Sequence, residues 1–459
     1  MSNICAPATA PGGAMAIIRV SGPDAISITS SIFSKDLTQA AGYTLHYGWI
    51  KSLSDPENTV IDDVLVSVFR APHSYTGEDS TEISCHGSRY IIQKILELLI
   101  HAGARMATPG EFTKRAFLAG KMDLSQAEAV ADLIASGNKA THHMAMSQMR
   151  GGFSRELDSL RQQLLQLTSL LELELDFSDH EDIEFADRTQ LTQLSDSLYN
   201  HVKHLTDSFC TGNALKNGIP VAIIGAPNVG KSTLMNSLVH EERAIVSDIQ
   251  GTTRDLIEDT IMIEGISFRF IDTAGIRKTA DRIEKMGIER SMQAARKADI
   301  IILLTEPNKP FPDIRLPHSI EFPELPVILR VINKSDLVIP DSSFLYHRQQ
   351  KDQDIHISSL TGAGMSILQE ALISAAHKVL DAGNTNTQTI VTNLRHYEAL
   401  HHALDALSRI RHALADNIPG DLIAENLRQC LHYLSEITGG EITSDEVLHN
   451  IFKNFCIGK

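Results

Sequence analysis

The chain has few cysteines, and their spacing argues against a structural zinc site and against a disulfide framework. Only five occur among its 459 residues, and no two of them form a C-x-x-C pair. Structural zinc sites and secreted disulfide frameworks both use closely spaced cysteines. The sequence therefore favours a reducing compartment, and we expect a cytoplasmic protein. The five are Cys5, Cys85, Cys210, Cys430 and Cys456.

Long apolar runs are also missing. No stretch of about 18 uncharged apolar residues occurs, so we predict no membrane span. The first 20 residues lack a basic segment before their apolar part and do not resemble a signal peptide. The ending NFCIGK places Cys456 as in a prenylation box. However, Gly458 stands where an aliphatic residue is expected, and Lys459 is not a small or apolar last residue.

Positive charge is scarce. The chain has 41 lysines and arginines against 57 acidic residues, a net charge of −16. A chain this acidic is not a strongly electrostatic nucleic-acid binder by itself, so RNA would need a local basic patch or a partner. At 42% hydrophobic and 21% charged residues, the composition is that of a globular protein. The length suggests about three domains at roughly 150 residues each.

The first 120 residues mix strand and helix signals. A buried strand is predicted over 64–69, and a helix over 89–103. Two further helices carry capping boxes at their starts and glycines at their ends. Because both helices are bounded, Lys121 lies in a short link between them. The signals are Thr108, Pro109 as first helical residue, Glu111 and Gly120, then Ser125, Glu128 and Gly137.

Leucines at spacings of three and four predict long packed helices over 122–210 and again after 377. Neither half buries its apolar stripe alone, so we expect the two to form one helical domain. The acidic interval 176–185 is interpreted as a solvated turn rather than a metal loop. A last helix is predicted from a capping box at Thr443 and Glu446. The stripes are Leu157, Leu160, Leu164, Leu167 and Leu171; Leu191, Leu194, Leu198, Val202 and Leu205; and Leu400, Leu404, Leu407, Ile410 and Leu414.

Between these helical halves, short apolar runs alternate with helical or loop segments over 218–375. That alternation predicts a mainly parallel sheet in an α/β domain. The expected architecture is therefore multidomain, with an α/β domain inserted in a helical domain and an α+β domain before both. The predicted boundaries are 1–120, 121–216, 217–376 and 377–459.

A phosphate-binding loop marks the inserted domain. The sequence GAPNVGKST follows a predicted strand and opens a predicted helix, and it fits G-x-x-x-x-G-K-[ST] through Gly225, Gly230, Lys231 and Ser232. The glycines let backbone N–H groups surround phosphates, and the helix N-terminus adds partial positive charge. Lys231 is placed to reach the β- and γ-phosphate oxygens. The Ser232 hydroxyl can ligate Mg²⁺.

Four more motifs follow in order and turn this loop into a predicted GTP site. Thr253 offers a second hydroxyl to Mg²⁺, Asp272 can hold the Mg²⁺ shell, and Gly275 can approach the γ-phosphate. Asp336 offers a carboxylate to guanine N1–H and its exocyclic amine, a donor pair that adenine lacks. The last motif can set a backbone N–H against guanine O6. The motifs are GTTRD at 251–255, DTAG at 272–275, NKSD at 333–336 and SSLTG at 358–362.

The catalytic detail departs from Ras-like enzymes, which place a glutamine after the D-x-x-G turn to orient water. Here that residue is Ile276, which cannot hydrogen-bond. Something must also replace an arginine finger, which contributes about 10³–10⁵ in rate. A monovalent cation caged by Asn228 and the flap 247–252 is one solution. A loop-shaping role for Asn228 is the alternative.

Together with stretches outside the G motifs, these residues resemble the MnmE (TrmE) family of tRNA modification GTPases over essentially the full length of the chain. The G motifs occur in many GTPases, whereas the N-terminal blocks and the tail are far more specific. The matching stretches are SYTGED (74–79), PGEFTKRAF (109–117), DLSQAEAV (123–130), PNVGKS, GTTRD, DTAGIR, NKSD and the terminal FCIGK.

The resemblance implies a homodimer whose N-terminal α+β domains pair and bind a one-carbon tetrahydrofolate, in a 5,10-methylene or 5-formyl form. With the flavoprotein MnmG, which brings FAD and NADH, such dimers form a heterotetramer. Together they install an aminomethyl or carboxymethylaminomethyl group at C5 of the wobble uridine of certain tRNAs. GTP is hydrolysed to GDP when the two G domains meet, with K⁺ in place of an arginine finger.

The resemblance also implies roles for single residues. Glu284 would orient the attacking water; a solvated helix face is its other interpretation. A thiol role in the modification and an inert, packed cysteine are both open for Cys456. Ser247 stands where many relatives carry threonine, and the turn Ala10–Ala16 lacks the basic residue that relatives often have. The implied K⁺ ligands are Asn228, Ser247, Ile249 and Thr252; the Mg²⁺ ligands Ser232 and Thr253; and the folate residues Arg19, Glu82, Lys121 and Lys459.

The motifs and the resemblance together nominate one set of GTP-binding residues. These are Gly225, Asn228, Val229, Gly230, Lys231, Ser232, Thr233, Ser247, Asp248, Ile249, Gln250, Gly251, Thr252, Thr253, Asp272, Thr273, Ala274, Gly275, Asn333, Lys334, Asp336, Ser358, Ser359 and Leu360.

Two other functions fit a GTP site. The first is a switch in ribosome assembly or translation, but such proteins often carry an RNA module such as a K-homology domain. The residues after 375 instead show leucine-periodic helices with acidic neighbours. The second is a membrane-associated switch, against which the missing span and missing polybasic patch count.

Overall fold

The computed structural model describes residues 2–10, 12–51, 59–176, 188–241, 259–271, 294–312, 326–337, 354–382, 389–416, 418, 420–440, 448, 451–453, 455 and 458. The chain divides into two compact units, each built from segments far apart in the sequence. The first is Met1–Ala135, Ala145–Ser195 and Ala406–Lys459, and the second is Ser136–Met144 and Asp196–Asp405.

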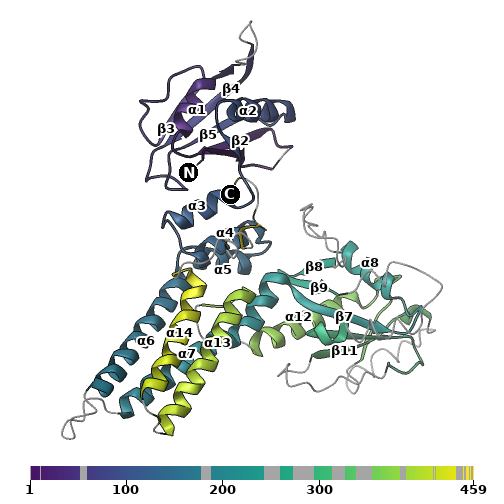
Figure 1. Ribbon diagram of the computed structural model, residues 1–459. Coiled ribbons are helices and arrows are strands. Elements are labelled where there is room, and N and C mark those ends of the chain that lie inside the picture. Colours follow the sequence, from purple (N-terminus) through teal and green to yellow (C-terminus); the bar gives the residue numbers. More distant parts are fainter. Residues whose placement is uncertain are drawn as a thin grey trace. The chain divides into compact units, whose positions relative to one another are not determined.

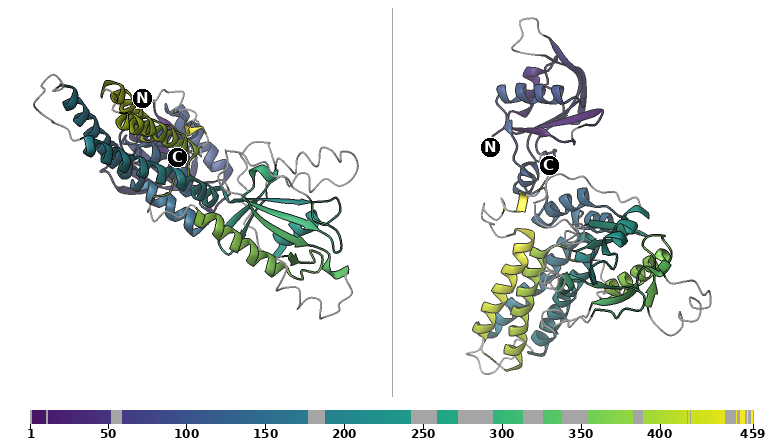
Figure 2. Two further views of the ribbon diagram at one scale, coloured as in Figure 1. Left: turned by 90° about the horizontal axis from the view of Figure 1, so that it is seen from below. Right: turned by 90° about the vertical axis from the view of Figure 1, so that its right-hand side faces the viewer.

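The N-terminal part of the first unit is a six-stranded sheet with helices on one face (Figures 1 and 2). The strand order is β3-β4-β5-β2-β1-β6, with every pairing antiparallel except β1 with β6. Buried aliphatic residues of α1 and α2 pack against the sheet in one core. The predicted strand 64–69 and helix 89–103 are confirmed as β4 and α2. The elements are β1 (Ile4–Pro7), β2 (Met15–Ser21), α1 (Ala25–Ile32), β3 (Thr44–Lys51), β4 (Val60–Phe69), β5 (Ser80–His86), α2 (Arg89–His101) and β6 (Arg105–Met106).

The other face of this sheet is only partly covered. Near β1, Ile4 and Phe112 are fully buried in a small core. Along β3 and β4, however, four large apolar side chains face solvent, here called the apolar strip: Leu45 (61% exposed), Tyr47 (58%), Trp49 (39%) and Leu65 (37%). Tyr47 lies directly opposite Leu65 in the β3–β4 register, so the strip is continuous across two strands.

The helices α3 (Glu111–Leu118) and α4 (Leu124–Ala135) start differently from the prediction. Pro109 is not the first residue of α3, because Gly110 in a left-handed conformation precedes its first turn. Glu111 does reach back, accepting from the Thr108 backbone N–H at 3.0 Å. The second capping box also lies elsewhere.

In α4 the predicted Ser125 lies inside the helix, and the reciprocal capping pair is Asp123 with Gln126. The Gln126 N–H donates to Asp123 Oδ1, and the Asp123 N–H donates to Gln126 Oε1, both at 2.9 Å. Ser125 is displaced from the capping role because its own hydroxyl donates to Asp123. Lys121 still lies in the short α3–α4 link, as predicted, after Gly120 with its φ of 67°.

The predicted helical segments are confirmed wherever the structure describes them. The helices α6 and α14 pack side by side in the first unit (Figure 1). The stripes are buried except for Leu194 and Leu404, which are half-buried. Residues 177–185 of the acidic interval lie outside the described residues. The helices are α5 (Lys139–Met149), α6 (Gly152–Asp176), α7 (Arg188–Asn217), α13 (Leu394–Ala415) and α14 (Gly420–Thr438).

The inserted α/β domain is a six-stranded sheet in the order β12-β11-β10-β7-β9-β8, drawn in teal and green in Figures 1 and 2. The predicted parallel sheet is confirmed, with one addition: β8 runs antiparallel to β9. Separate buried clusters cover its two faces. Its elements are β7 (Ile219–Gly225), α8 (Lys231–Glu241), β8 (Asp259–Ile263), β9 (Ile266–Phe270), β10 (Ile300–Thr305), β11 (Val327–Ile332), η1 (Ser335–Leu337), β12 (Asp354–His356) and α12 (Met365–Ala382).

The C-terminal segment returns to the N-terminal half of the first unit. Leu448 and Phe452 are buried against Leu124 and Ala127 of α4. Thr443 and Glu446, the predicted cap of this segment, lie outside the described residues. None of the described helices is long and apolar enough to cross a membrane.

Candidate functional site

The phosphate-binding loop joins β7 to α8, as the sequence predicts. Asn228 and Gly230 take left-handed conformations with φ of 64° and 96°, which turn the loop back into the first turn of α8. The Lys231 ammonium donates to the carbonyls of Gly225 (2.6 Å) and Ala226 (3.1 Å). Burial lowers the pKa of Lys231. A half-buried cation beside helix N–H groups is suited to phosphate oxygens, and Ser232 and Thr233 begin the same helix.

The side-chain amide of Asn333, at the end of β11, joins this loop to the base-recognition motifs. Its Nδ2 donates to the Val229 carbonyl at 2.9 Å, and its Oδ1 accepts from the Ser359 N–H at 3.0 Å and hydroxyl at 2.9 Å. Asn333 is only 2% exposed. Gly230 passes so close that a Cβ there would lie 2.3 Å from Asn333 Nδ2. Three of the predicted motifs therefore meet at one amide.

Ser358 holds Asp336, the residue predicted to recognise the base. It lies exposed on the short helix η1, and its Oδ1 accepts a hydrogen bond of 2.5 Å from the Ser358 hydroxyl. That bond orients the carboxylate and leaves its outer edge facing solvent, where a guanine N1–H and amine would approach. Leu360 lies two residues after Ser358 in the same loop, and it is 80% exposed.

Lys334 makes a contact that the sequence did not predict. Its ammonium donates to the Asn228 carbonyl at 2.7 Å and pairs with Glu306 Oε1 at 2.5 Å. Glu306 also pairs with Lys309. Hydrogen bonds from Lys309 and then Lys334 lower the pKa of Glu306 to about 2. The position of Glu306 directly after β10 could have indicated that it lies at the site, because carboxyl ends of parallel strands meet at one edge of a sheet.

The remaining nucleotide-site predictions lie outside the described residues and stay predictions. They are Ser247, Asp248, Ile249, Gln250, Gly251, Thr252, Thr253, Asp272, Thr273, Ala274, Gly275 and Glu284.

A second constellation lies on the N-terminal sheet, where the structure brings two predicted folate residues together. Arg19 of β2 donates to Glu82 Oε1 of β5 through Nε (2.9 Å) and Nη2 (2.7 Å). The guanidinium lies over the rings of Tyr75 and Phe112, at 5.2 and 5.6 Å from their centroids. Its Nη1 donates to the carbonyl of Gly458 in the C-terminal tail, at 3.3 Å.

The tail needs a glycine at position 458. Gly458 has a φ of 94°, and a Cβ there would lie 2.1 Å from the Pro7 carbonyl oxygen. Lys121 lies beside the 74–79 loop, since its Cε would be 3.4 Å from a Cβ on Gly77. Lys459 and Cys456 lie outside the described residues, so their roles stay predictions.

Three other cysteines are poor candidates for thiol chemistry. Burial raises the pKa of Cys5 to about 11, that of Cys430 to about 12 and, with the charge of Asp62, that of Cys85 to about 11. The reactive form of cysteine is the thiolate, so these three side chains are unreactive near neutral pH.

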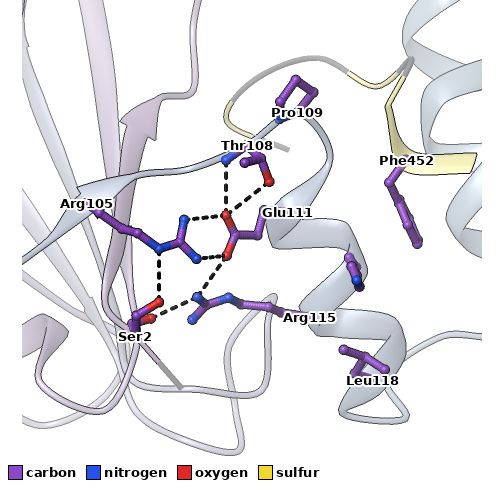
Figure 3. A pocket seen from close by; sticks show the side chains of 9 residues that line it. Ser2, Arg105, Thr108, Pro109, Glu111, Arg115, Leu118 and Phe452 are labelled. Atoms are coloured by element: carbon purple, nitrogen blue, oxygen red, sulfur yellow. Dashed lines mark hydrogen bonds and ion pairs between the residues drawn. The ribbon is translucent and has the colours of Figure 1, made fainter. Parts of the chain in front are cut away.

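A cavity of about 420 Å³ opens between the first residues, β6 and α3 (Figure 3). On its wall, Glu111 accepts from Arg105 at 2.8 and 2.6 Å and from Arg115 at 3.0 Å. Arg115 also donates to Glu78 of the 74–79 loop and to the Ser2 carbonyl. Figure 3 shows both guanidinium groups directed at Glu111 rather than into the open space.

These ion pairs form a clasp rather than an anion site. Arg115 is 6% exposed, and its terminal nitrogens already donate to the two carboxylates and the Ser2 carbonyl. Burial alone would raise the pKa of Glu111, but hydrogen bonds from Arg105, the Thr108 backbone and Arg115 lower it to about 2. The clasp fixes α3 to the 74–79 loop. Both carry residues around Arg19, so the clasp supports that constellation from behind.

Comparisons with known proteins cover the whole chain. A family model described as the MnmE helical domain matches residues 124–456, and one described as the GTP-binding protein TrmE N-terminus matches residues 3–121. A protein named tRNA modification GTPase MnmE from Bacteroides thetaiotaomicron is 54% identical over 470 residues, covering 100% of this chain and 99% of the relative. Relatives with the same name from Phocaeicola vulgatus (52% over 500 residues) and Parabacteroides distasonis (52% over 475 residues) cover 100% of this chain and 99% and 100% of their own length.

The Asn333 junction predicts that Gly230→Ala weakens nucleotide binding. The new Cβ would push Asn333 from the loop and strain a left-handed residue, so we expect the Kd for GDP to rise by about 10- to 100-fold. Fluorescent GDP titration measures it. Gly265→Ala is the matched control, because Gly265 has a φ of 82° but a Cβ added there would meet nothing within 4 Å. Unchanged GDP affinity in Gly230→Ala would show that the junction tolerates displacement.

The clasp predicts a specific pH dependence of stability. The pKa of Glu111 is about 2 in the folded chain against 4.5 ordinarily, so its carboxylate stabilises the fold above about pH 4.5. That stabilisation is lost as the pH falls from there toward 2. Glu111→Gln should therefore lower Tm at pH 7 by about 2–6 °C relative to wild type. This difference in Tm between wild type and variant should become smaller as the pH falls from 5 to 3.

Differential scanning calorimetry across that pH range measures both effects. Glu97→Gln serves as the control, because the Glu97 pKa is also lowered but its pair with Lys94 is exposed on α2 and contributes little. A constant Tm deficit for Glu111→Gln at every pH would contradict the assignment.

Proposed function

The chain belongs to the tRNA modification GTPase MnmE family, and from that premise we propose a specific reaction. Its GTP hydrolysis serves the addition of a carboxymethylaminomethyl or aminomethyl group to C5 of the wobble uridine, position 34, of certain tRNAs. A one-carbon tetrahydrofolate gives the methylene carbon. The observation that carries the proposal is identity above 50% along the full length of relatives so named, N-terminal domain included.

The described residues support GTP binding in named roles. Backbone N–H groups at the start of α8 would face the phosphates, Lys231 would turn to them from the Gly225 and Ala226 carbonyls, and Asp336 would receive the guanine edge. Ser232 and Thr253 would hold Mg²⁺, which neutralises charge on the β- and γ-phosphates. Glu284 would orient the attacking water, the task that Ile276 cannot perform.

A monovalent cation is proposed in place of an arginine finger. K⁺ would be held by Asn228, Ser247, Ile249 and Thr252. Its positive charge would stabilise the negative charge that develops on the leaving phosphate. Oxygen donors are the ligands a hard cation requires, and Asn228 is exposed on the outer side of the loop. We propose that this cage closes when the G domains of two copies meet.

The folate proposal is supported by the convergence around Arg19. The Arg19–Glu82 pair beside two aromatic rings offers flat surfaces and a carboxylate acceptor to the N–H groups of a pterin ring. Lys121 and Lys459 would add ammonium groups. The thiols of Cys5, Cys85 and Cys430 are buried and Cys210 is exposed on α7, so the proposal of a thiol role for Cys456 rests on its place in the tail beside Lys459.

The apolar strip supports the proposed homodimer through the N-terminal domains. Exposed, contiguous apolar side chains on a sheet face commonly mark an interface, and a second copy would bring its own strip. The flavoprotein MnmG, with FAD and NADH, is proposed as the further partner in a heterotetramer. Cytoplasmic localisation and the domain boundaries 1–120, 121–216, 217–376 and 377–459 also stay proposals.

The reaction predicts a loss of modified wobble uridine in a strain without this protein. Liquid chromatography–mass spectrometry of tRNA nucleosides measures it. Wild type should restore the modification, whereas Arg19→Gln should restore less than about a tenth of it, because a half-buried ion pair and the tail contact are lost together. Arg89→Gln, an exposed arginine in the same domain, is the control. Unchanged wobble uridines in the deletion strain would remove the proposed reaction.

The dimer proposal predicts that Tyr47→Asp yields monomers. A charge at the centre of the apolar strip would be desolvated without a partner in the interface. Light scattering after size exclusion, at micromolar concentration, gives the mass. Tyr90→Asp is the matched control, since Tyr90 is 65% exposed on α2, which packs on the sheet's other face. A Tyr47→Asp variant that keeps the mass of two chains would exclude the strip as the interface.

A further inference from the structure

Three left-handed residues lie around one contact of the nucleotide site. Asn228 (φ 64°), Asn308 (φ 65°) and Lys334 (φ 61°) are three of the five non-glycine residues with positive φ in the described part of the chain. Such conformations are uncommon outside glycine, and they persist only where surrounding contacts determine them. Here all three belong to the segments that meet at the Lys334–Glu306 ion pair.

The contacts form a short chain from β10 to the phosphate loop. The turn after β10, which contains Asn308, presents Glu306 with a side chain 18% exposed. Glu306 accepts from Lys334 at 2.5 Å, and Lys334 donates to the Asn228 carbonyl at 2.7 Å. The lysine therefore joins a fixed carboxylate to the backbone of the residue proposed to ligate the cation.

We propose that Glu306 is a positioning residue which, acting through Lys334, holds Asn228 in the conformation that receives the monovalent cation. The inference rests on the K⁺ dependence in the proposed function. In this proposal Glu306 acts through Lys334 and is not itself a ligand of the nucleotide or the cation.

The physical reason is the number of partners that hold the ammonium in place. Lys334 is one-third exposed and ends a flexible four-carbon chain. With Glu306 present, two acceptors fix its position, and charge assistance strengthens one of these bonds. Without Glu306, the single bond to the Asn228 carbonyl competes with water. The left-handed backbone of Asn228 then loses its outside support.

Glu306 has a second partner that makes a control available. Lys309 lies in the same turn at i+3, pairs with the other carboxylate oxygen and is 63% exposed. Lys309→Gln removes that surface pair and leaves the chain through Lys334 to Asn228 intact. A role of Glu306 limited to shaping its own turn would make both variants behave alike.

The experiment is a KCl titration of GTPase activity at constant ionic strength, balanced with NaCl, in the full-length protein. For Glu306→Ala we expect the half-activating K⁺ concentration to rise at least about fivefold, the order of one charge-assisted hydrogen bond. Glu306→Gln keeps an acceptor and should shift it by about twofold, in the same direction. Lys309→Gln should stay within about twofold of wild type, and GDP affinity in NaCl should change less than about threefold in all three.

Several outcomes overturn the inference. An unchanged half-activating concentration in Glu306→Ala refutes it, and so does an equal shift in Lys309→Gln. If Glu306→Ala does not fold, Glu306→Gln decides by the same criterion. Equal rates of GTP hydrolysis by the wild type in KCl and in NaCl would instead contradict the proposed K⁺ dependence, and this inference would fail with it. If K⁺ activates the wild type and the variants keep its half-activating K⁺ concentration, this inference is refuted but the proposed function stands.

Discussion

The amide of Asn333 is the contact on which the nucleotide site depends. A single buried side chain accepts from the Ser359 loop and donates to the phosphate loop, so it sets the separation of the phosphate and base subsites. Its burial makes these bonds costly to lose, since a buried amide without partners is unfavourable by about 1–3 kcal/mol. Gly230 is required on the same account, because only a residue without a Cβ lets the loop approach this amide.

Much of this architecture was predictable because local patterns carried it. The alternation of apolar runs predicted the parallel sheet, and the leucine spacing predicted α6, α7 and α13. The motifs predicted which loops meet at the carboxyl edge of the sheet. The helix starts were less predictable, because Thr108 and Ser125 fit the capping pattern as well as the true cap Asp123 does. At α3 a tertiary contact accounts for the start, because a Cβ on Gly110 would lie 2.8 Å from the Phe452 carbonyl oxygen. At α4 the choice is local, because the Ser125 hydroxyl donates to Asp123, which forms the reciprocal pair with Gln126.

Contacts between residues distant in sequence could not be predicted. Arg115 and Glu78 are 37 residues apart, and Arg19 and Gly458 are 439 apart. Nothing in either local pattern selects the partner, and many other pairings satisfy the same charges. The apolar strip was missed for a different reason. Alternation in β3 indicates two faces, but it does not say that the face bearing Tyr47 and Trp49 faces solvent rather than the core.

A tRNA-modifying protein of net charge −16 presents an electrostatic difficulty, since phosphate contacts supply most nucleic-acid affinity. The N-terminal domain does not resolve it, because its arginines are largely engaged in pairs: Arg19 with Glu82, Arg105 and Arg115 with Glu111, Arg70 with Asp79. Paired guanidinium groups attract phosphate far less than free ones. Under the proposed function, the cationic surface for tRNA would therefore lie outside these pairs, and the proposed partner protein is one source of it.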